Sequence, residues 1–261
     1  MARLTGKTCL VTGAARGIGE AIVRAFVDEG AQVYLTDIDQ QAGQVAAKDI
    51  GCQFLPLDVS VESDWARIAG EVPVLDVLVN NAGITGFEHG MVAHDPENAS
   101  LQDWRAVHKV NLDGTFLGCR YAIAAMRKNG GNGSIINISS RSGMVGIPAA
   151  AAYASSKAAI RNHSKTVALY CAQERLNIRC NSIHPAAILT PMWEPMLGEG
   201  DKRAASMKKL VADIPMHRFG EPCEVAAIAV LLASDEAAYM NGSELTIDGG
   251  ILAGSSASPG E

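Results

Sequence analysis

The segment KTCLVTGAARGIG, residues 7–19, determines the fold that we expect for this chain. It begins with a short β-branched apolar run, typical of a buried strand, and passes through glycines into a helical pattern over 18–28. The start of a helix offers free N–H groups and a positive dipole to a phosphate, and Gly13, Gly17 and Gly19 permit the turn and a close approach. Because the turn joins a strand to a helix, we expect Arg16, Ile18 and these glycines to bind a dinucleotide, rather than form a structural turn only.

The same alternation of strand and helix continues to the end of the chain. Six further strand patterns follow: AQVYLTD, GCQFLPLDV, LDVLVNNAG, GSIINISS, IRCNSIHP and SELTID. The longest helical patterns between them cover 101–126 and 153–172. Strands separated by helical crossovers pair in parallel with right-handed connections. We therefore expect one doubly wound, Rossmann-type α/β domain over 1–261, with a parallel sheet of about seven strands flanked by helices on both faces. Residues 186–212 are expected to form a substrate lid and 253–261 a flexible tail.

Composition excludes several classes of function. The chain has 261 residues and a formal net charge of -6, whereas nucleic-acid binding needs a concentrated basic face. Its apolar runs, such as AAIAVLLA, are too short to span a bilayer, and its first residues lack the apolar segment of a signal peptide. We therefore expect a cytoplasmic protein with no nucleic-acid or membrane partner. The six cysteines and six histidines form no metal-ligand motif, so we expect no metal site.

Asp37 closes the second strand pattern. An acidic residue at this position accepts hydrogen bonds from the adenosine ribose hydroxyls and repels a 2'-phosphate, which favours NAD over NADP. Arg16 would soften this preference by offering a cation to a phosphate. The alternative for Asp37 is a cap on the helix that begins near Gln40.

Two further strand ends supply candidate cofactor contacts. Asp58 and Val59 follow the third strand, where adenine would lie, although Asp58 could instead cap a helix starting near Glu62. NNAG follows the fourth strand, and its small residues allow the backbone to line a cofactor while its asparagines tie neighbouring strand ends together. We expect Asn81, Ala82 and Gly83 to contact the cofactor.

Tyr153 and Lys157 lie four residues apart in an alanine-rich helical run, so they share one face of the helix. A free tyrosine has a pKa of about 10, and a neighbouring positive charge favours the phenolate. The pair is therefore expected to bring the pKa of Tyr153 toward neutrality and make it a proton donor and acceptor. The alternative is a surface tyrosine and lysine on an ordinary helix.

Five motifs together point to one family. TGAARGIG, NNAG, the Asn111 of NLDGTF, the NISS that ends at Ser140, and YASSK occur in this order over residues 6–250. In order and spacing the chain resembles the short-chain dehydrogenase/reductase family. Each motif alone is common, but their combination is specific.

The resemblance implies roles for the four polar residues. Tyr153 would be the general acid/base, and Lys157 would hold the nicotinamide ribose and lower the pKa of Tyr153. Ser140 would donate a hydrogen bond to the substrate oxygen, and Asn111 would position a water that relays protons from Lys157. Alternatively, Ser140 caps a turn, and Asn111 kinks the long helix for packing reasons.

The chain departs from the family pattern after the sixth strand. The family usually has Pro-Gly there, and this chain has Pro185 and Ala186. Because alanine does not reach positive φ cheaply, we expect a different loop path beside the nicotinamide. By resemblance Pro185, the Ile188 backbone and the Thr190 hydroxyl contact the cofactor.

The substrate pocket is expected between residues 84–100, 141–150 and 186–210. The lid carries an apolar cluster of Met192, Trp193, Met196 and Leu197, and no convergent group of cations. These features favour a neutral secondary alcohol or ketone, alicyclic or steroid-like, as the small-molecule substrate. His89 and His94 lie in a segment that is a few residues longer than is usual in the family, and this segment would add a further wall to the pocket.

Two other functions stay open at this point. One is a 3-oxoacyl thioester reductase that uses NADPH, and the other is a dinucleotide-binding sensor or scaffold. By resemblance, the helices that begin near Leu101 and Tyr153 would pair across a twofold axis in a homotetramer, or in a homodimer.

Overall fold

The computed structural model describes residues 2–88, 90 and 92–254. Strand β1 (Thr8–Thr12) leads through the glycine turn into helix α1 (Gly17–Asp28), as the opening segment predicted. The other strands are β2 (Gln32–Asp37), β3 (Gln53–Pro56), β4 (Val77–Asn80), β5 (Asn132–Ile138), β6 (Asn177–Pro185) and β7 (Glu244–Ile247). The main helices are α2 (Gln40–Ile50), α3 (Glu62–Glu71), α4 (Leu101–His108), α5 (Gly114–Lys128), α6 (Ala151–Gln173), α7 (Glu194–Leu197), α8 (Gly200–Leu210) and α9 (Pro222–Ala233).

The described strands form one sheet in the order β3-β2-β1-β4-β5-β6-β7, and every pairing is parallel. The chain moves outward from β1 to β3, returns to place β4 beside β1, and then continues to β7. This reversal confirms the doubly wound Rossmann-type fold. The carboxyl ends of β1 and β4 meet at the point of reversal, where ligands bind in open sheets of this kind.

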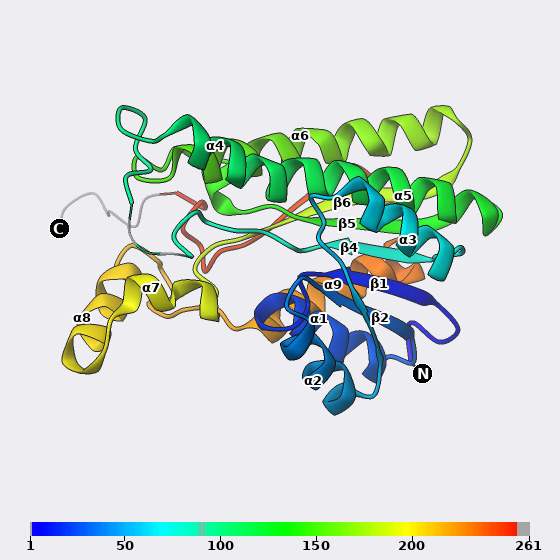
Figure 1. The fold of residues 1–261 in the computed structure, drawn as a ribbon, viewed down its shortest axis with the longest axis horizontal. Helices are drawn as coiled ribbons and strands as arrows, with labels where there is room; N and C mark the ends of the chain where they lie inside the picture. Colours follow the sequence, from blue (N-terminus) through cyan, green and yellow to red (C-terminus); the bar gives the residue numbers. More distant parts are fainter. Residues whose placement is uncertain (1, 89, 91, 255–261) are drawn as a thin grey trace.

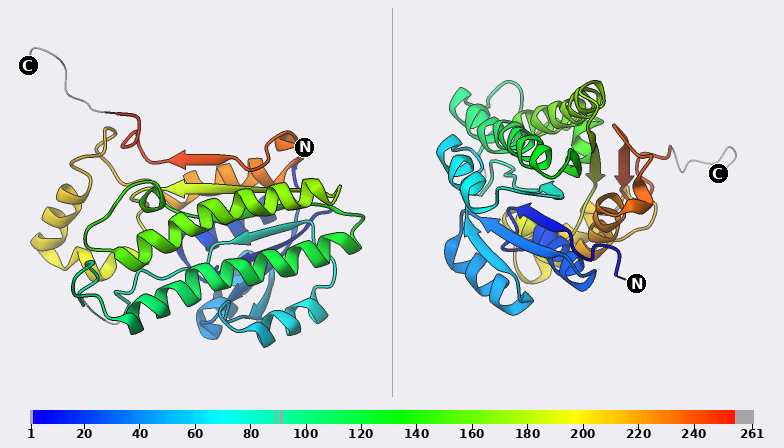
Figure 2. Two further views of the ribbon diagram at one scale, coloured as in Figure 1. Left: turned by 90° about the horizontal axis from the view of Figure 1, so that it is seen from above. Right: turned by 90° about the vertical axis from the view of Figure 1, so that its right-hand side faces the viewer.

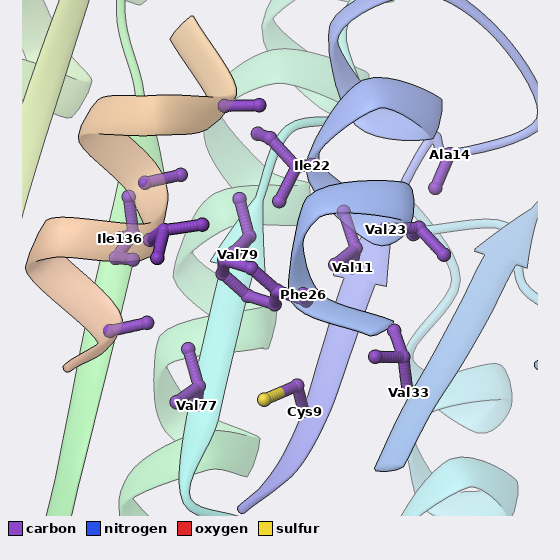
Figure 3. Packing of buried hydrophobic residues seen from close by; sticks show 14 of the residues in the cluster. Cys9, Val11, Ala14, Ile22, Val23, Phe26, Val33, Val77, Val79 and Ile136 are labelled. Carbon is purple, nitrogen blue, oxygen red and sulfur yellow. The ribbon is translucent and has the colours of Figure 1, made fainter. Parts of the chain in front are cut away.

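Helices cover both faces of the sheet, with α1, α2 and α9 on one side and α3, α5 and α6 on the other (Figures 1 and 2). Alternate residues of β1 belong to the hydrophobic cores on opposite faces of the sheet. Cys9 and Val11 belong to the core that contains Phe26 of α1, and Leu10 belongs to the core that contains Trp65 of α3. Figure 3 shows Phe26 packed against the strands. Because the strands are buried on both faces, their sequences appear as continuous apolar runs.

Helix α9, which carries the apolar run AAIAVLLA, packs against α1 and the sheet. Val225, Ala229 and Val230 are buried there. The sequence analysis gave no bounds for this helix, because a run that is apolar all round lacks the stripe that marks a helix at the surface. None of the described helices is long and apolar enough to cross a membrane.

Helices α7 and α8 lie within the expected lid and project from the end of the sheet where the parallel strands finish (Figure 1). No residue of α8 is buried, and its partly covered residues are Arg203, Ser206, Met207 and Leu210. These positions follow the spacing of one helical face. Helix α8 is therefore covered along one face only, and part of this cover comes from α7. The expected tail at 253–261 falls mostly on 255–261, which lie outside the described residues.

Candidate active site

The glycine turn after β1 is packed tightly against the segment that follows β4. Gly13 has φ +61, and a Cβ added to it would lie 2.6 Å from Ala82 Cα. A Cβ on Gly19 would lie 2.5 Å from Asn81 Nδ2. These two glycines are therefore required by the protein's own packing. No side chain caps the start of α1, so its first N–H groups remain available to an anion, and the turn fits the phosphates of a dinucleotide.

The NNAG segment joins neighbouring strands, as the sequence predicted. Thr12 Oγ1 accepts hydrogen bonds from Asn81 N and Ala82 N, at 3.0 and 3.1 Å. Asn81 Nδ2 donates to the carbonyls of Thr12 and Gly13. Asn80 Nδ2 reaches Asn137 Oδ1 on β5, at 2.8 Å. The ends of β1, β4 and β5 are thus held by side-chain amides and one hydroxyl.

Asp37 lies at the end of β2, where its carboxylate accepts hydrogen bonds from Ala15 N at 3.0 Å and Asp39 N at 2.9 Å. The residue that caps α2 is Asp39, which accepts from Ala42 N. The alternative in which Asp37 caps this helix is therefore wrong. The guanidinium of Arg16 forms an ion pair with the Asp39 carboxylate.

Asp58 forms a local turn, in which its carboxylate accepts hydrogen bonds from the backbone and the hydroxyl of Ser60. The N-cap position of α3 is occupied by Val61, so the alternative in which Asp58 caps this helix is also wrong. The carbonyl of Val59 accepts from Trp65 Nε1, and its side chain lies against Gly114. Both residues follow the carboxyl end of β3, at the same edge of the sheet as Asp37.

Tyr153 and Lys157 share one face of α6, with Lys157 Nζ 5.7 Å from the centre of the Tyr153 ring. Lys157 is only 4% exposed, and its ammonium donates to the carbonyl of Ile138 at 2.9 Å. A Cβ on Gly83 would lie 3.3 Å from Lys157 Nζ and 3.3 Å from Asn111 Oδ1. The alternative of an ordinary surface pair is therefore wrong, because the lysine is enclosed between the end of β5 and the segment that follows β4.

The electrostatics of this pair differ from the prediction. Burial raises the pKa of Tyr153, and the neighbouring Ser140 hydroxyl acts in the opposite direction. Burial also lowers the pKa of Lys157, to about 8. For the protein by itself, the expectation that Lys157 brings the pKa of Tyr153 toward neutrality is therefore wrong. Removal of the phenol from water outweighs the opposing effect of the Ser140 hydroxyl.

Ser140 follows β5 and is 8% exposed. Its Oγ accepts a hydrogen bond from Ser142 N at 3.1 Å and starts the 3-10 turn Arg141–Gly143, so the capping alternative is confirmed. Capping uses the hydroxyl as an acceptor and leaves its proton free to be donated. The carbonyl of Ser140 faces His184 Nδ1 at 3.3 Å, and Nε2 of this fully buried histidine lies 2.8 Å from Ser182 Oγ. The sequence analysis did not identify His184, because no spacing rule links it to Ser140.

Asn111 lies in a π-helical segment, Lys109–Asp113, that interrupts the helical run between α4 and α5. The alternative in which Asn111 distorts this helix is consistent with that geometry. Its amide also bonds the backbone of Ile84 and donates to Ser156 Oγ at 3.0 Å. The sequence analysis missed Ser156, which lies inside the YASSK motif and connects α6 to this segment.

The segment over 84–100 folds back onto α6. His94 Nε2 lies 3.0 Å from the carbonyl of Gly86, its ring meets Phe87 edge-on, and its own carbonyl accepts from Ala151 N. Because His94 is 3% exposed, it packs this loop rather than facing solvent. His89 lies outside the described residues. No group of metal-binding side chains is present in the part of the chain that the structure describes.

Comparison with known proteins agrees with this geometry. The adh_short_C2 family model, described as enoyl-(acyl carrier protein) reductase, matches residues 13–252. The chain belongs to the short-chain dehydrogenase/reductase family. It is 40% identical to the NADP-dependent (R)-specific alcohol dehydrogenase of Lentilactobacillus kefiri, with 96% of this chain and 98% of the relative covered. It is also 40% identical to 3-beta-hydroxysteroid dehydrogenase of Comamonas testosteroni, with 96% and 97% covered.

A solved structure shows the same fold. Levodione reductase superposes with a TM-score of 0.87 and 29% identity, and 97% of this chain and 100% of that chain are covered. As a short-chain dehydrogenase/reductase, this chain is an oxidoreductase that acts on alcohol groups with a nicotinamide dinucleotide.

The departure of this short-chain dehydrogenase/reductase from the Pro-Gly pattern is accommodated locally. Ala186 keeps a negative φ, since in the described chain only Arg175 and His217 among the non-glycine residues have a positive one. Ala186 N donates to Ile247 O, and Ile188 N donates back to Ala186 O. Pro185 ends β6 and is buried, as is the side chain of Ile188.

Thr190 brings the start of the lid onto the glycine turn, because a Cβ on Gly17 would lie 3.4 Å from Thr190 Cβ. The apolar cluster of the lid is divided beyond this point. Leu197 is fully buried, and Trp193 meets Phe219 edge-on at 5.6 Å, whereas Met192 is 40% exposed and Met196 is partly exposed. Packing onto the body therefore accounts for Leu197 and Trp193, and the exposure of Met192 leaves it available to a ligand.

Proposed function

We propose that this chain is an NAD-dependent oxidoreductase that acts on a neutral secondary alcohol or ketone, with alicyclic or hydroxysteroid-like compounds as its substrates. The observation that carries the proposal is the convergence of Ser140, Tyr153 and the buried Lys157 beside Gly83 and the uncapped start of α1. When bound, the nicotinamide supplies the acceptor or donor of the hydride. The chain's own residues accept and donate the proton of the alcohol.

In the oxidation direction, Tyr153 takes the proton of the alcohol as general base, and in reduction it returns this proton as general acid. Ser140 donates its hydroxyl proton to the substrate oxygen, where charge develops in the transition state. Lys157 holds the nicotinamide ribose. Asn111 positions a water that passes protons between Lys157 and solvent.

The residues at the end of β2 support the choice of NAD. The Asp37 carboxylate would bond the adenosine ribose and repel a 2'-phosphate. Arg16, the cation that could compensate, is already paired with Asp39. The Lentilactobacillus relative is described as NADP-dependent, and the ratio of kcat/KM for NAD to that for NADP tests the preference of this chain.

The substrate class follows from the lid and from one relative. The cations of α8 are exposed or, in Arg203, paired with Glu194, and none of them is buried toward the site. A substrate with a carboxylate would therefore lack an enclosed partner. The description of the Comamonas relative as a hydroxysteroid dehydrogenase supports an alicyclic alcohol.

The test is turnover of NAD(H) with a panel of cyclic alcohols, steroids, sugars and 3-oxoacyl thioesters. Tyr153→Phe removes only the hydroxyl, and we expect it to lower kcat by about 10²–10⁴-fold without loss of NADH binding. Tyr239→Phe, at a fully exposed position outside the site, is the matched control and should retain full activity. Retained turnover in Tyr153→Phe would refute the proposed mechanism.

A second candidate is a 3-oxoacyl thioester reductase that uses NADPH. It is favoured by the description of the matching family model and by three exposed lysines on α8, Lys202, Lys208 and Lys209, which offer a basic surface to an acidic carrier protein. Faster turnover of acetoacetyl thioester with NADPH than of any cyclic ketone with NADH would establish this candidate. NADH binding without turnover of any compound would instead support a sensor or scaffold.

We also propose that the protein forms a homotetramer, or a homodimer, through α5 and α6. Phe116, Leu169 and Tyr170 on these helices are 48%, 71% and 46% exposed. Large apolar side chains that are exposed together mark an interaction surface. Light scattering tests this assembly, and a monomer mass would refute it.

A further inference from the structure

The segment that follows NNAG is held in place by an active-site residue. Ile84 N donates to Asn111 Oδ1 at 2.8 Å, and Asn111 Nδ2 donates back to Ile84 O at 2.9 Å. Farther along, His94 ties the carbonyl of Gly86 to the start of α6, where Ala151 N donates to the His94 carbonyl. Residues 84–88 are therefore fixed both to the π-helical segment and to the helix that carries Tyr153.

Glu88 places a charge on this fixed segment. Its Oε1 accepts hydrogen bonds from Thr85 N at 2.6 Å and Thr85 Oγ1 at 2.9 Å, and its Oε2 accepts from Gly86 N at 2.9 Å. Three donors orient the carboxylate, although the residue as a whole is exposed. No ion pair involves Glu88 within the described part of the chain. Among the described residues, the Glu88 carboxylate is thus oriented by hydrogen bonds and not by a cation.

The loop that carries this charge lies beside the start of the helix that carries Tyr153. Gly86, whose N–H binds the Glu88 carboxylate, is tied through His94 to Ala151, two residues before Tyr153, so the carboxylate lies on a loop beside the start of α6. The negative charge of Glu88 also raises the pKa of Tyr153. The known donors to Glu88 all come from its own loop, so lone pairs of the carboxylate remain for a bound molecule. A substrate on Tyr153 would therefore meet a fixed anion on the side of residues 84–88.

We propose that Glu88 is a specificity-determining residue, whose carboxylate selects substrates that carry a second hydrogen-bond donor, a hydroxyl or an ammonium, and rejects substrates that carry a carboxylate or a phosphate. This inference rests on the proposed function and names the substrate class of the same site. A fixed anion repels a like charge and accepts a hydrogen bond from a donor, and both effects act on substrate choice more than on turnover.

The experiment compares three cyclohexanols that differ in one substituent: cyclohexanol, 4-aminocyclohexanol and 4-hydroxycyclohexanecarboxylate. The natural protein should have its highest kcat/KM with the amino alcohol and its lowest with the carboxylate. Glu88→Gln keeps the size and removes the charge, and it should narrow the ratio between these two substrates by about tenfold. Raised ionic strength should narrow the same ratio in the natural protein.

Glu97→Gln is the matched control, because Glu97 is an exposed glutamate on the same connection and its side chain forms none of the described hydrogen bonds or ion pairs. It should leave the ratio unchanged. An unchanged ratio in Glu88→Gln would overturn the inference, whatever happens to turnover of cyclohexanol itself.

Turnover of cyclohexanol distinguishes a failure of the proposed function from a failure of the inference about Glu88. If the natural protein oxidised none of the three alcohols and no other alcohol of the panel, the proposed function would have failed. The inference would then be decided by binding of cyclohexylamine and cyclohexanecarboxylate to the protein with NADH, which requires no turnover. Tighter binding of the amine that is lost in Glu88→Gln would support the role of Glu88, and equal binding of both compounds would contradict it.

Discussion

The amide of Asn111 and the backbone of Ile84 exchange two hydrogen bonds, one in each direction. A third bond from the same amide reaches Ser156 on α6. The residue is fully buried, so each of these polar groups depends on its protein partner. Asn111 therefore holds the loop after β4, the π-helical segment and α6 in one arrangement, whatever its part in proton transfer.

Asn111→Ala should lower both stability and activity. It leaves the N–H and the carbonyl of Ile84 without partners, at a cost of about 1–3 kcal/mol for each group in the free energy of unfolding. Denaturant unfolding measures this loss. Ser156→Ala removes only the third hydrogen bond and should have a smaller effect. Equal stability of the Asn111→Ala variant and the natural protein would show that Ile84 finds other partners.

Asp37 and Arg16 should set the cofactor preference together. Asp37→Ser removes the charge at the ribose position, and we expect the ratio of kcat/KM for NAD to that for NADP to fall by about 10–100-fold, since a hydrogen bond to a charged group contributes about 1.5–3 kcal/mol. Asp39→Asn keeps a good helix cap but releases Arg16, and should lower the ratio further when combined with Asp37→Ser. A natural protein that prefers NADP would contradict the argument.

Substitutions at two glycines should distinguish the cost of backbone strain from the cost of steric crowding. Gly13 and Gly51 both have positive φ, but an added Cβ meets Ala82 at Gly13 and nothing within 4 Å at Gly51. Gly51→Ala should cost about 1–2 kcal/mol of stability and leave NADH binding intact. Gly13→Ala should cost more and abolish NADH binding, because the turn must move away from the NNAG segment. Thermal unfolding and NADH fluorescence titration measure the two effects.

The ionisation of Tyr153 should depend on the cofactor. Burial raises its pKa, so the phenol keeps its proton through neutral pH and ionises only above the ordinary value of about 10 in the protein alone. We expect the pKa to fall when NAD, whose nicotinamide is cationic, is bound. Ser140→Ala should raise the pKa, because the Ser140 hydroxyl acts to lower it. Tyrosinate absorbance with Tyr153→Phe as the blank measures each value, and ionisation near neutrality without NAD would contradict the expectation.

The sequence predicted the sheet well because strand and helix patterns are local, and the order of a doubly wound sheet follows from their alternation. It also predicted the ties between NNAG and the neighbouring strand ends. It assigned no cap to Asp39, since two acidic residues near a helix start look alike in sequence. It predicted the pKa of Tyr153 in the wrong direction, because spacing reveals a lysine nearby but not the depth at which both groups are buried. Ser156 and His184 were missed because the site residues that they contact, Asn111 and Ser140, are distant in sequence.

The contact between Thr190 and Gly17 has a kinetic consequence. Thr190, close to the start of the lid, lies beside the turn that is proposed to hold the dinucleotide phosphates, so an occupied turn offers the lid a different support from an empty one. The dinucleotide and the alcohol should therefore not bind in random order. We expect a compulsory order in which the dinucleotide arrives first and leaves last, and in which the lid encloses the alcohol only after that first arrival.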